Sequence, residues 1–328
     1  MIRLLGEFSV YVGSLKSSAT RIPQVFALNF CSPTAVMNPA SMTGSKSLLP
    51  FLMGPADRDE YRKTLADLVV DIHDPSRLNA MEIQALNKRL RCTNMVIYRC
   101  AAPENVTREH VSKLANQMGL GRPDRNLLAA KDGLSEVEVK GEAPFAHYIP
   151  YTNRPLNWHS DGYYQSGQRI IRSMLLHCAH PAERGGALTA IDHRILFSLL
   201  AELDIRFPEA LSRTDAMTIP AHYEDGASRG ASQGPVFFFE QNTLRMRYTA
   251  RKHNVIWASD VLFQEALSAL QELFEQSTDF QYTRRLELGE GILCANVPHR
   301  RESFEDGTDQ KPKRLMYRGR FQESLNLG

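Results

Sequence analysis

The sequence lacks long apolar runs and has little net charge. No apolar run is long enough to span a bilayer. Lys plus Arg number 39 against 37 for Asp plus Glu, and no long basic run occurs. This balance argues against a dedicated nucleic-acid binder. We therefore expect no membrane partner and no nucleic-acid partner, while assembly into a homo-oligomer stays open.

Cysteine is also scarce, and several familiar motifs are missing. The five cysteines are odd in number and widely spaced, so we expect reduced thiols in a cytoplasmic protein rather than a disulfide framework. The N-terminus is interrupted by Glu7 and has no ordered targeting signal. There is no GxSxG, no P-loop and no CxxC pair, so the chemistries of those motifs have no support.

Hydrophobic spacing predicts a mixture of helices and strands. Helices are predicted over 57–73, 79–92 with Asn79 as the N-cap, 107–120, 194–203 and 259–276. Strands are predicted over 94–100, 135–140, 172–180, 187–192 and 314–323, with hairpins over 235–249 (turning at Gln241-Asn242) and 284–301 (turning at Gly289 to Gly291).

Strands dominate the second half, and the helices are inserted without regular alternation. This pattern favours an α+β protein with an antiparallel sandwich or jelly roll over a doubly wound sheet. We expect an N-terminal extension over 1–78, irregular and helical. A jelly-roll domain over 79–328 follows, with a helical insertion at roughly 194–285.

The stretch "NWHSDGYY" raises the possibility of a metal site. On a strand, residues i and i+2 face the same side, so His159 and Asp161 can point at one ion. The alternative is a hydrogen-bonded surface turn. His299 in "VPHRR" supplies a second imidazole. Two histidines and one carboxylate form the facial triad that leaves positions open on iron(II).

The last predicted strand carries arginines on one face. With a period of two, Arg314, Arg318 and Arg320 share a face with Met316, and the opposite face is mostly apolar. The arginine face either meets solvent or lines a cavity. In a cavity, these guanidiniums are suited to holding carboxylates.

These motifs together resemble a known family. "WHSDG", the distant "PH" and "RLMYR" are similar to the taurine/2,4-dichlorophenoxyacetate dioxygenase-like enzymes over roughly residues 94–321. The resemblance implies a double-stranded β-helix (jelly-roll, cupin-like) core. It also implies dependence on iron(II), 2-oxoglutarate and dioxygen, with release of succinate and carbon dioxide. His159, Asp161 and His299 are then the metal ligands, and no catalytic group is expected beyond the metal centre.

The resemblance also implies how the cosubstrate is held. Arg314 matches the arginine that binds the distal carboxylate of 2-oxoglutarate, and Arg318 matches a second arginine near the cosubstrate or substrate. The family places a Thr or Ser hydroxyl where this chain has Leu188. Thr189 is one residue further along, which on a strand is the opposite face. Either the turn shifts by one residue and Thr189 binds the cosubstrate, or another group does so.

The substrate is expected to be a small molecule, anionic or like an amino acid. Tyr163, Tyr164, Arg247 and Arg318 are candidate substrate contacts, although the tyrosines can equally be packing aromatics and Arg247 can lie on a solvated edge. Related halogenases lack the carboxylate of the triad, so Asp161 favours hydroxylation or a related oxidation. Two other classes stay open: a zinc hydrolase with the same ligands, and a jelly-roll protein that binds without catalysis.

Overall fold

The computed structural model describes residues 49–124, 132–140, 148–222, 229–251, 253–307 and 312–327. The chain divides into a unit of residues 1–42 and a unit of residues 43–328, and all described residues lie in the second. Among them, no helix is both long and apolar enough to cross a membrane. The four cysteines in these ranges are free thiols, three of them buried.

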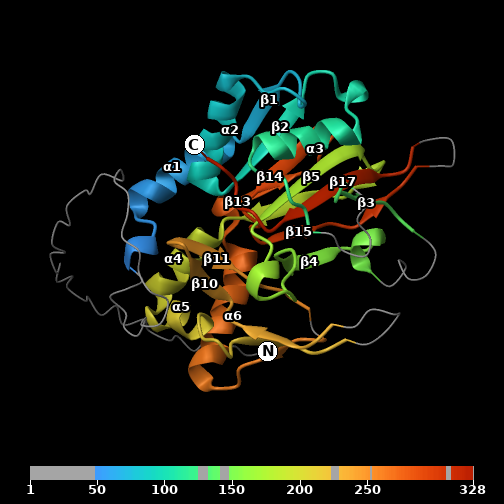
Figure 1. Ribbon diagram of the computed structural model, residues 1–328. Helices are drawn as coiled ribbons and strands as arrows, with labels where there is room; N and C mark the ends of the chain where they lie inside the picture. Colours follow the sequence, from blue (N-terminus) through green and yellow to red (C-terminus); the bar gives the residue numbers. More distant parts are fainter. Residues whose placement is uncertain are drawn as a thin grey trace, which may run out of the picture. The chain divides into compact units, whose positions relative to one another are not determined.

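The larger of two main sheets has six strands in the order β1-β2-β14-β5-β17-β3 (Figure 1). All neighbouring pairs are antiparallel except β1 and β2, which run parallel. The strands are β1 Val69–Ile72, β2 Met95–Cys100, β14 Glu290–Cys294, β5 Ser173–His180, β17 Leu315–Phe321 and β3 Ser135–Val137.

The smaller main sheet has four strands in the order β13-β7-β15-β4, all antiparallel. They are β13 Gln281–Arg284, β7 Leu188–Ile191, β15 His299–Arg301 and β4 Leu156–His159. The predicted hairpin over 284–301 is wrong, because β13 belongs to the smaller sheet and β14 to the larger one. Gly291 lies within β14, between Tyr98 and His177, rather than at a turn.

Three of the helices come before β4, the first strand of the smaller sheet along the chain. They are α1 Pro55–Ala66, α2 Ala80–Thr93 and α3 Arg108–Gln117. Asn79 caps α2 and Glu82 completes the capping box, which confirms the predicted start of this helix. Side chains of α2 and α3, including Leu86, Leu90 and Leu114, form a buried cluster with β2, β5 and β14. These two helices therefore cover the outer face of the larger sheet.

The predicted helix over 57–73 ends early, at Ala66. Residues 69–72, "VVDI", instead form β1 and pair in register with 97–100 of β2. The unit of residues 43–328 thus includes α1 and β1, which lie in the segment predicted as an N-terminal extension over 1–78. The β-branched residues of this segment extend the larger sheet at its edge.

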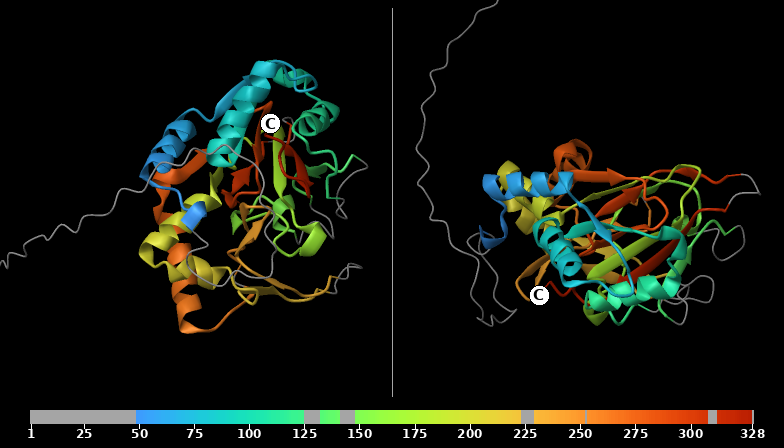
Figure 2. Two further views of the ribbon diagram at one scale, coloured as in Figure 1. Left: turned by 60° about the vertical axis from the view of Figure 1, so that its left-hand side comes forward. Right: turned by 90° about the horizontal axis from the view of Figure 1, so that it is seen from above.

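The segment between β7 and β13 carries most of the remaining structure. Its helices lie on the opposite side of the sheets from α2 and α3 (Figures 1 and 2). Trp158 of β4 stacks on Phe274 of α6, with ring centroids 4.8 Å apart, so α6 packs on the smaller sheet. Gln241 and Asn242 have φ of 48° and 58°, which confirms the predicted hairpin turn. The elements are α4 His193–Leu203, α5 Arg206–Leu211, β8 Met217–Ile219, β9 Ser232–Gly234, β10 Phe237–Glu240, β11 Thr243–Met246, β12 Ile256–Trp257 and α6 Val261–Gln276.

The remaining elements are short. A two-stranded ribbon pairs β6 Arg184–Gly185 with β16 Phe304–Glu305. The 3-10 turns are η2 Leu49–Phe51, η3 Pro103–Asn105, η5 Ile149–Tyr151, η6 Gly167–Arg169 and η7 Thr278–Phe280.

Candidate active site

Two histidines meet where β4 and β15 pair. His159 and His299 are direct register partners, and their ring centroids lie 4.4 Å apart. Each ring donates from Nδ1 to a backbone carbonyl: His159 to Asn157 at 2.8 Å and His299 to Val297 at 3.0 Å. A neutral ring protonated at Nδ1 keeps a lone pair on Nε2, which is the state that binds a metal. Burial lowers the pKa of His159 to about 3, so this ring is neutral at physiological pH.

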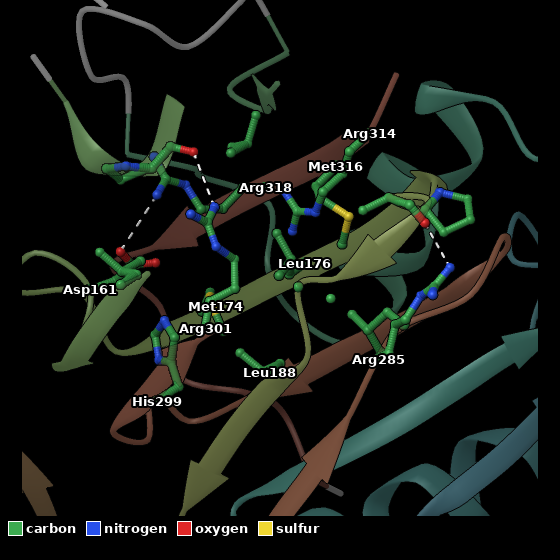
Figure 3. Close-up of a pocket in the computed structure, with 18 of the residues that line it drawn as sticks. Asp161, Met174, Leu176, Leu188, Arg285, His299, Arg301, Arg314, Met316 and Arg318 are labelled. Atoms are coloured by element: carbon green, nitrogen blue, oxygen red, sulfur yellow. Dashed lines mark hydrogen bonds and ion pairs between the residues drawn. The ribbon is translucent and has the colours of Figure 1, made fainter. Parts of the chain in front are cut away.

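Asp161 follows the end of β4 and is buried beside the arginine face of β17. Its Oδ1 lies 3.9 Å from Nη1 of Arg318, the contact drawn as a dashed line in Figure 3. Its Oδ2 is buried and accepts no hydrogen bond from the described residues. Burial acts to raise the pKa of Asp161, but Arg318 and Arg320 outweigh it and bring the pKa down to about 2. The group is therefore a carboxylate with one oxygen available.

Asn296 holds the backbone at Asp161, and the sequence patterns did not single it out. Its Oδ1 accepts from the Asp161 N–H at 2.8 Å. Its Nδ2 donates to the carbonyls of Asp161 at 3.0 Å and Ile171 at 2.8 Å. Asn296 has a φ of 50°, a left-handed conformation that asparagine tolerates better than most residues. An asparagine shortly before a candidate ligand, in "CANVPH", was the available signal.

In the described part of the chain, no group of three or more His, Cys, Asp or Glu side chains is already arranged around a metal position. The structure brings the two histidines together, and the Asp161 carboxylate lies toward Arg318 instead. The donor types still fit a divalent transition metal: two imidazole nitrogens and a carboxylate with a free oxygen. His159, His299 and Asp161 all line one cavity, which makes them the residues that would hold such a metal.

A cavity that is partly open to solvent lies between the two main sheets beside these residues. Of the predicted arginine face, Arg314 just before β17 and Met316 and Arg318 within it line this cavity (Figure 3), whereas Arg320 is absent from the lining. Arg314 is buried, burial lowers its pKa, and its Nη1 has no hydrogen-bond partner among the residues described. The smaller sheet contributes Leu156, His159, Leu188, His299 and Arg301, and the larger sheet adds Val137, Met174 and Leu176.

Thr189 lies on the other face of β7 from the cavity. Its hydroxyl is 2.9 Å from that of Thr283 on the neighbouring strand β13. Leu188 lines the cavity instead. The turn therefore carries no one-residue shift, and this position offers an apolar side chain to the cavity.

Tyr163 and Tyr164 pack edge to face, with ring centroids 5.5 Å apart. The guanidinium of Arg251 lies 5.7 Å from the Tyr163 ring, and that of Arg229 lies 5.3 Å from the Tyr164 ring. Arg247 is buried and donates to the carbonyls of Tyr163 at 2.5 Å, Met217 at 3.3 Å and Ser232 at 2.8 Å. Arg247 thus ties the tyrosine segment to β8 and β9, and it does not line the cavity.

A buried polar network supports the same segment. Arg320 donates to Asp124 at 2.6 Å and to the hydroxyl of Tyr164 at 2.8 Å. Gln165 donates to both oxygens of Asp124 at 3.3 Å. Asp124 is distant in sequence and stands outside any recognisable motif, so its role emerges only from the fold.

The fold is of mixed α+β architecture, and its cavity brings two histidines together beside a carboxylate and several arginines. The profile of the family described as "Taurine catabolism dioxygenase TauD, TfdA family" matches residues 60–320. The chain therefore belongs to the TauD/TfdA family of iron(II)- and 2-oxoglutarate-dependent dioxygenases.

A uridine-5'-phosphate dioxygenase from Streptomyces sp is 27% identical over 217 residues, which cover 63% of this chain and 76% of the relative. An asparagine oxygenase solved with Fe(II), 2S,3S-3-hydroxyasparagine and succinate has a TM-score of 0.52 and 17% identity, covering 84% of this chain and 92% of that one.

Two further solved structures share the fold. The non-heme iron oxygenase OrfP, solved with Fe, succinate and (3S)-hydroxy-L-Arg, has a TM-score of 0.53 and 13% identity, covering 82% of this chain and 92% of that one. A taurine dioxygenase from Burkholderia xenovorans has a TM-score of 0.50 and 16% identity, covering 77% of this chain and 85% of that one.

Proposed function

We propose that the two main sheets form a double-stranded β-helix, or jelly roll. The support is the order of strands: β3, β4, β5 and β7 fall alternately in the larger and smaller sheets. The set β13, β14, β15 and β17 alternates in the same way. Each half thus winds between the sheets, and the cavity lies between them.

We propose that the protein oxidises a C–H bond of a small molecule, most simply by hydroxylation, using iron(II) and 2-oxoglutarate. The observation that carries this proposal is the convergence of His159 and His299, each anchored through Nδ1 to a backbone carbonyl, beside a buried carboxylate and an arginine-lined cavity. His159, His299 and Asp161 would hold the metal. When bound, the metal with 2-oxoglutarate and dioxygen supplies the oxidising power, and the cosubstrate ends as succinate and carbon dioxide.

The protein's own groups bind and orient the reactants. Arg314 presents a buried guanidinium with a free Nη1 to the cavity, where it would pair with the far carboxylate of 2-oxoglutarate. Arg318 lies 3.9 Å from Asp161 and lines the same cavity, where its guanidinium would help to hold an anionic group. The apolar walls formed by Met174, Leu176 and Leu188 exclude water from the reacting centre.

We further propose that the substrate carries an anionic group. Support comes from Arg318 beside the metal ligands and from Arg229 and Arg251, which lie over the two tyrosines that follow Asp161. The relative that acts on uridine 5'-phosphate makes nucleoside monophosphates the first compounds to test. The reduced thiols are consistent with the proposal of a cytoplasmic location.

The test is anaerobic reconstitution with iron(II) and 2-oxoglutarate, followed by succinate measurement in air. A visible charge-transfer band and succinate release are expected for the wild type. His299→Ala should abolish both, whereas Arg314→Ala should mainly raise the 2-oxoglutarate concentration required. Absence of the band with iron(II) bound would rule out the oxygenase. Zinc retained on purification, without succinate release, would favour a hydrolase.

A further inference from the structure

We propose that Arg301 is a second cosubstrate-binding arginine, which places a positive charge beside Arg314 at the far end of the 2-oxoglutarate site. This inference rests on the proposed function, because it assumes that the cavity takes a 2-oxo acid with a second carboxylate. Arg301 then makes the site selective for a dianionic 2-oxo acid.

The position of Arg301 follows from the register of β15. Arg301 comes two residues after His299 on the same strand, so both side chains face the cavity, and both line it. Its register partner on β7 is Leu188. Leu188 is apolar and the Thr189 hydroxyl lies on the other face, so β7 offers no side-chain donor to the cavity at this level. Arg301, on the neighbouring strand β15, brings a guanidinium to the position next to Leu188.

The two guanidiniums share a neighbour. The central carbon of Arg301 and that of Arg314 each lie 4.8 Å from the centroid of the Phe304 ring. Arg301 is 7% exposed and Arg314 is 6% exposed. Burial lowers the pKa of Arg301 to about 9, and the like charge of Arg314 adds to this effect. Two buried cations that repel each other are costly unless an anion joins them.

Within the described ranges, no carboxylate pairs with either guanidinium. Arg301 donates only to backbone carbonyls: those of Thr152 at 2.9 Å, Glu302 at 3.3 Å and Pro150 at 3.5 Å, and that of Arg154. Asp306 accepts from the backbone N–H of Arg314 at 2.9 Å rather than from its side chain. These four bonds fix the Arg301 side chain in place without neutralising its charge, and they leave one of its five N–H donors, on Nη1, for a ligand.

The experiment compares two cosubstrate analogues that differ only at the far end. 2-Oxoglutarate carries a second carboxylate, and 2-oxovalerate has a methyl group in its place. Binding of each to the iron(II)-loaded protein is measured anaerobically by calorimetry. The variants are Arg301→Gln, Arg301→Lys and the matched control Arg300→Gln. Arg300 is the next residue on the same strand, but it faces outward, where it pairs with Glu275 at 3.1 Å and covers Trp158.

Arg301→Gln is expected to weaken 2-oxoglutarate binding by about 30-fold and to change 2-oxovalerate binding by less than about threefold. Arg301→Lys should still bind 2-oxoglutarate in preference to 2-oxovalerate, because it keeps the positive charge. If Arg301→Gln does not fold, the two affinities of Arg301→Lys test the proposal instead. Arg300→Gln should match the wild type for both acids. Equal weakening of both acids in the Arg301 variants, or unchanged discrimination, would overturn the proposal. If the wild type bound neither acid, the proposed function itself would fail.

Discussion

Asn296 offers the sharpest test of how this chain positions its candidate metal ligands. Its side chain makes three buried hydrogen bonds at 2.8, 3.0 and 2.8 Å, two of them with the backbone of Asp161. At about 1 kcal/mol for each bond, Asn296→Gly should lower the free energy of unfolding by about 3 kcal/mol. Glycine accepts the left-handed φ of 50°, so the substitution adds no backbone strain to the loss of these hydrogen bonds. Asn296→Ala should cost about 1 kcal/mol more, because alanine is strained there.

The same change should weaken the metal site. Residues that orient a metal ligand typically contribute 10- to 100-fold to metal affinity, so about a 10-fold or greater loss is expected for both Asn296 variants. Stability is measured by urea denaturation, and metal affinity by anaerobic titration with iron(II) or cobalt(II).

Asn242→Gly is the matched control for Asn296→Gly. Asn242 also has a positive φ, of 58°, but it lies exposed in the hairpin between β10 and β11, and its variant should keep wild-type metal affinity. A folded Asn296→Gly protein with metal affinity within about threefold of wild type would refute the positioning role.

Three further outcomes are expected. Burial lowers the pKa of His177 to about 4, so the unfolded chain takes up a proton first as pH falls below 6.5, and stability declines between about pH 6.5 and 4. This histidine should account for about 2 kcal/mol of the fall in the free energy of unfolding between pH 7 and pH 5, as measured by urea denaturation. His177→Gln should remove that part of the fall, and an unchanged pH slope would contradict the prediction. Asp124→Asn should cost about 3 kcal/mol in the same assay, since it leaves the buried Arg320 guanidinium without its 2.6 Å partner, and a loss under about 1 kcal/mol would count against it. Gly291→Ala should lower the melting temperature by several degrees, because its Cβ would meet the Tyr98 ring at 2.3 Å; an unshifted midpoint would show that the ring moves freely.

The sequence predicted those features that depend on neighbours along the chain. Asn79 and Glu82 lie three residues apart and cap one helix end, so the start of α2 was predictable. The turn at Gln241-Asn242 likewise depends on local conformation, and Met316 and Arg318 share one face of β17 through its period of two. The spacing of His159 and Asp161 left a surface turn open, and only together with His299 and the arginine strand did it indicate candidate ligands.

Pairing between segments that lie far apart in the sequence could not be predicted from such local patterns. Residues 69–72 continue a helical pattern, but they form β1 because the exposed edge of β2 accepts them. The two runs of 284–301 look like a hairpin in sequence, yet they enter different sheets. In both cases local propensity was outweighed by hydrogen bonds and burial that only the assembled sheets provide.

The candidate site also combines features that the local sequence predicts with features that depend on long-range pairing. The order and type of His159, Asp161, His299 and Arg314 were determined by the sequence. Only the tertiary structure decided that His159 and His299 face each other in register, that Thr189 faces away from the cavity, and that Arg301 and Arg314 both lie against the Phe304 ring. A shift of one residue on a strand reverses the face of a side chain, and that register is set by partners more than a hundred residues away.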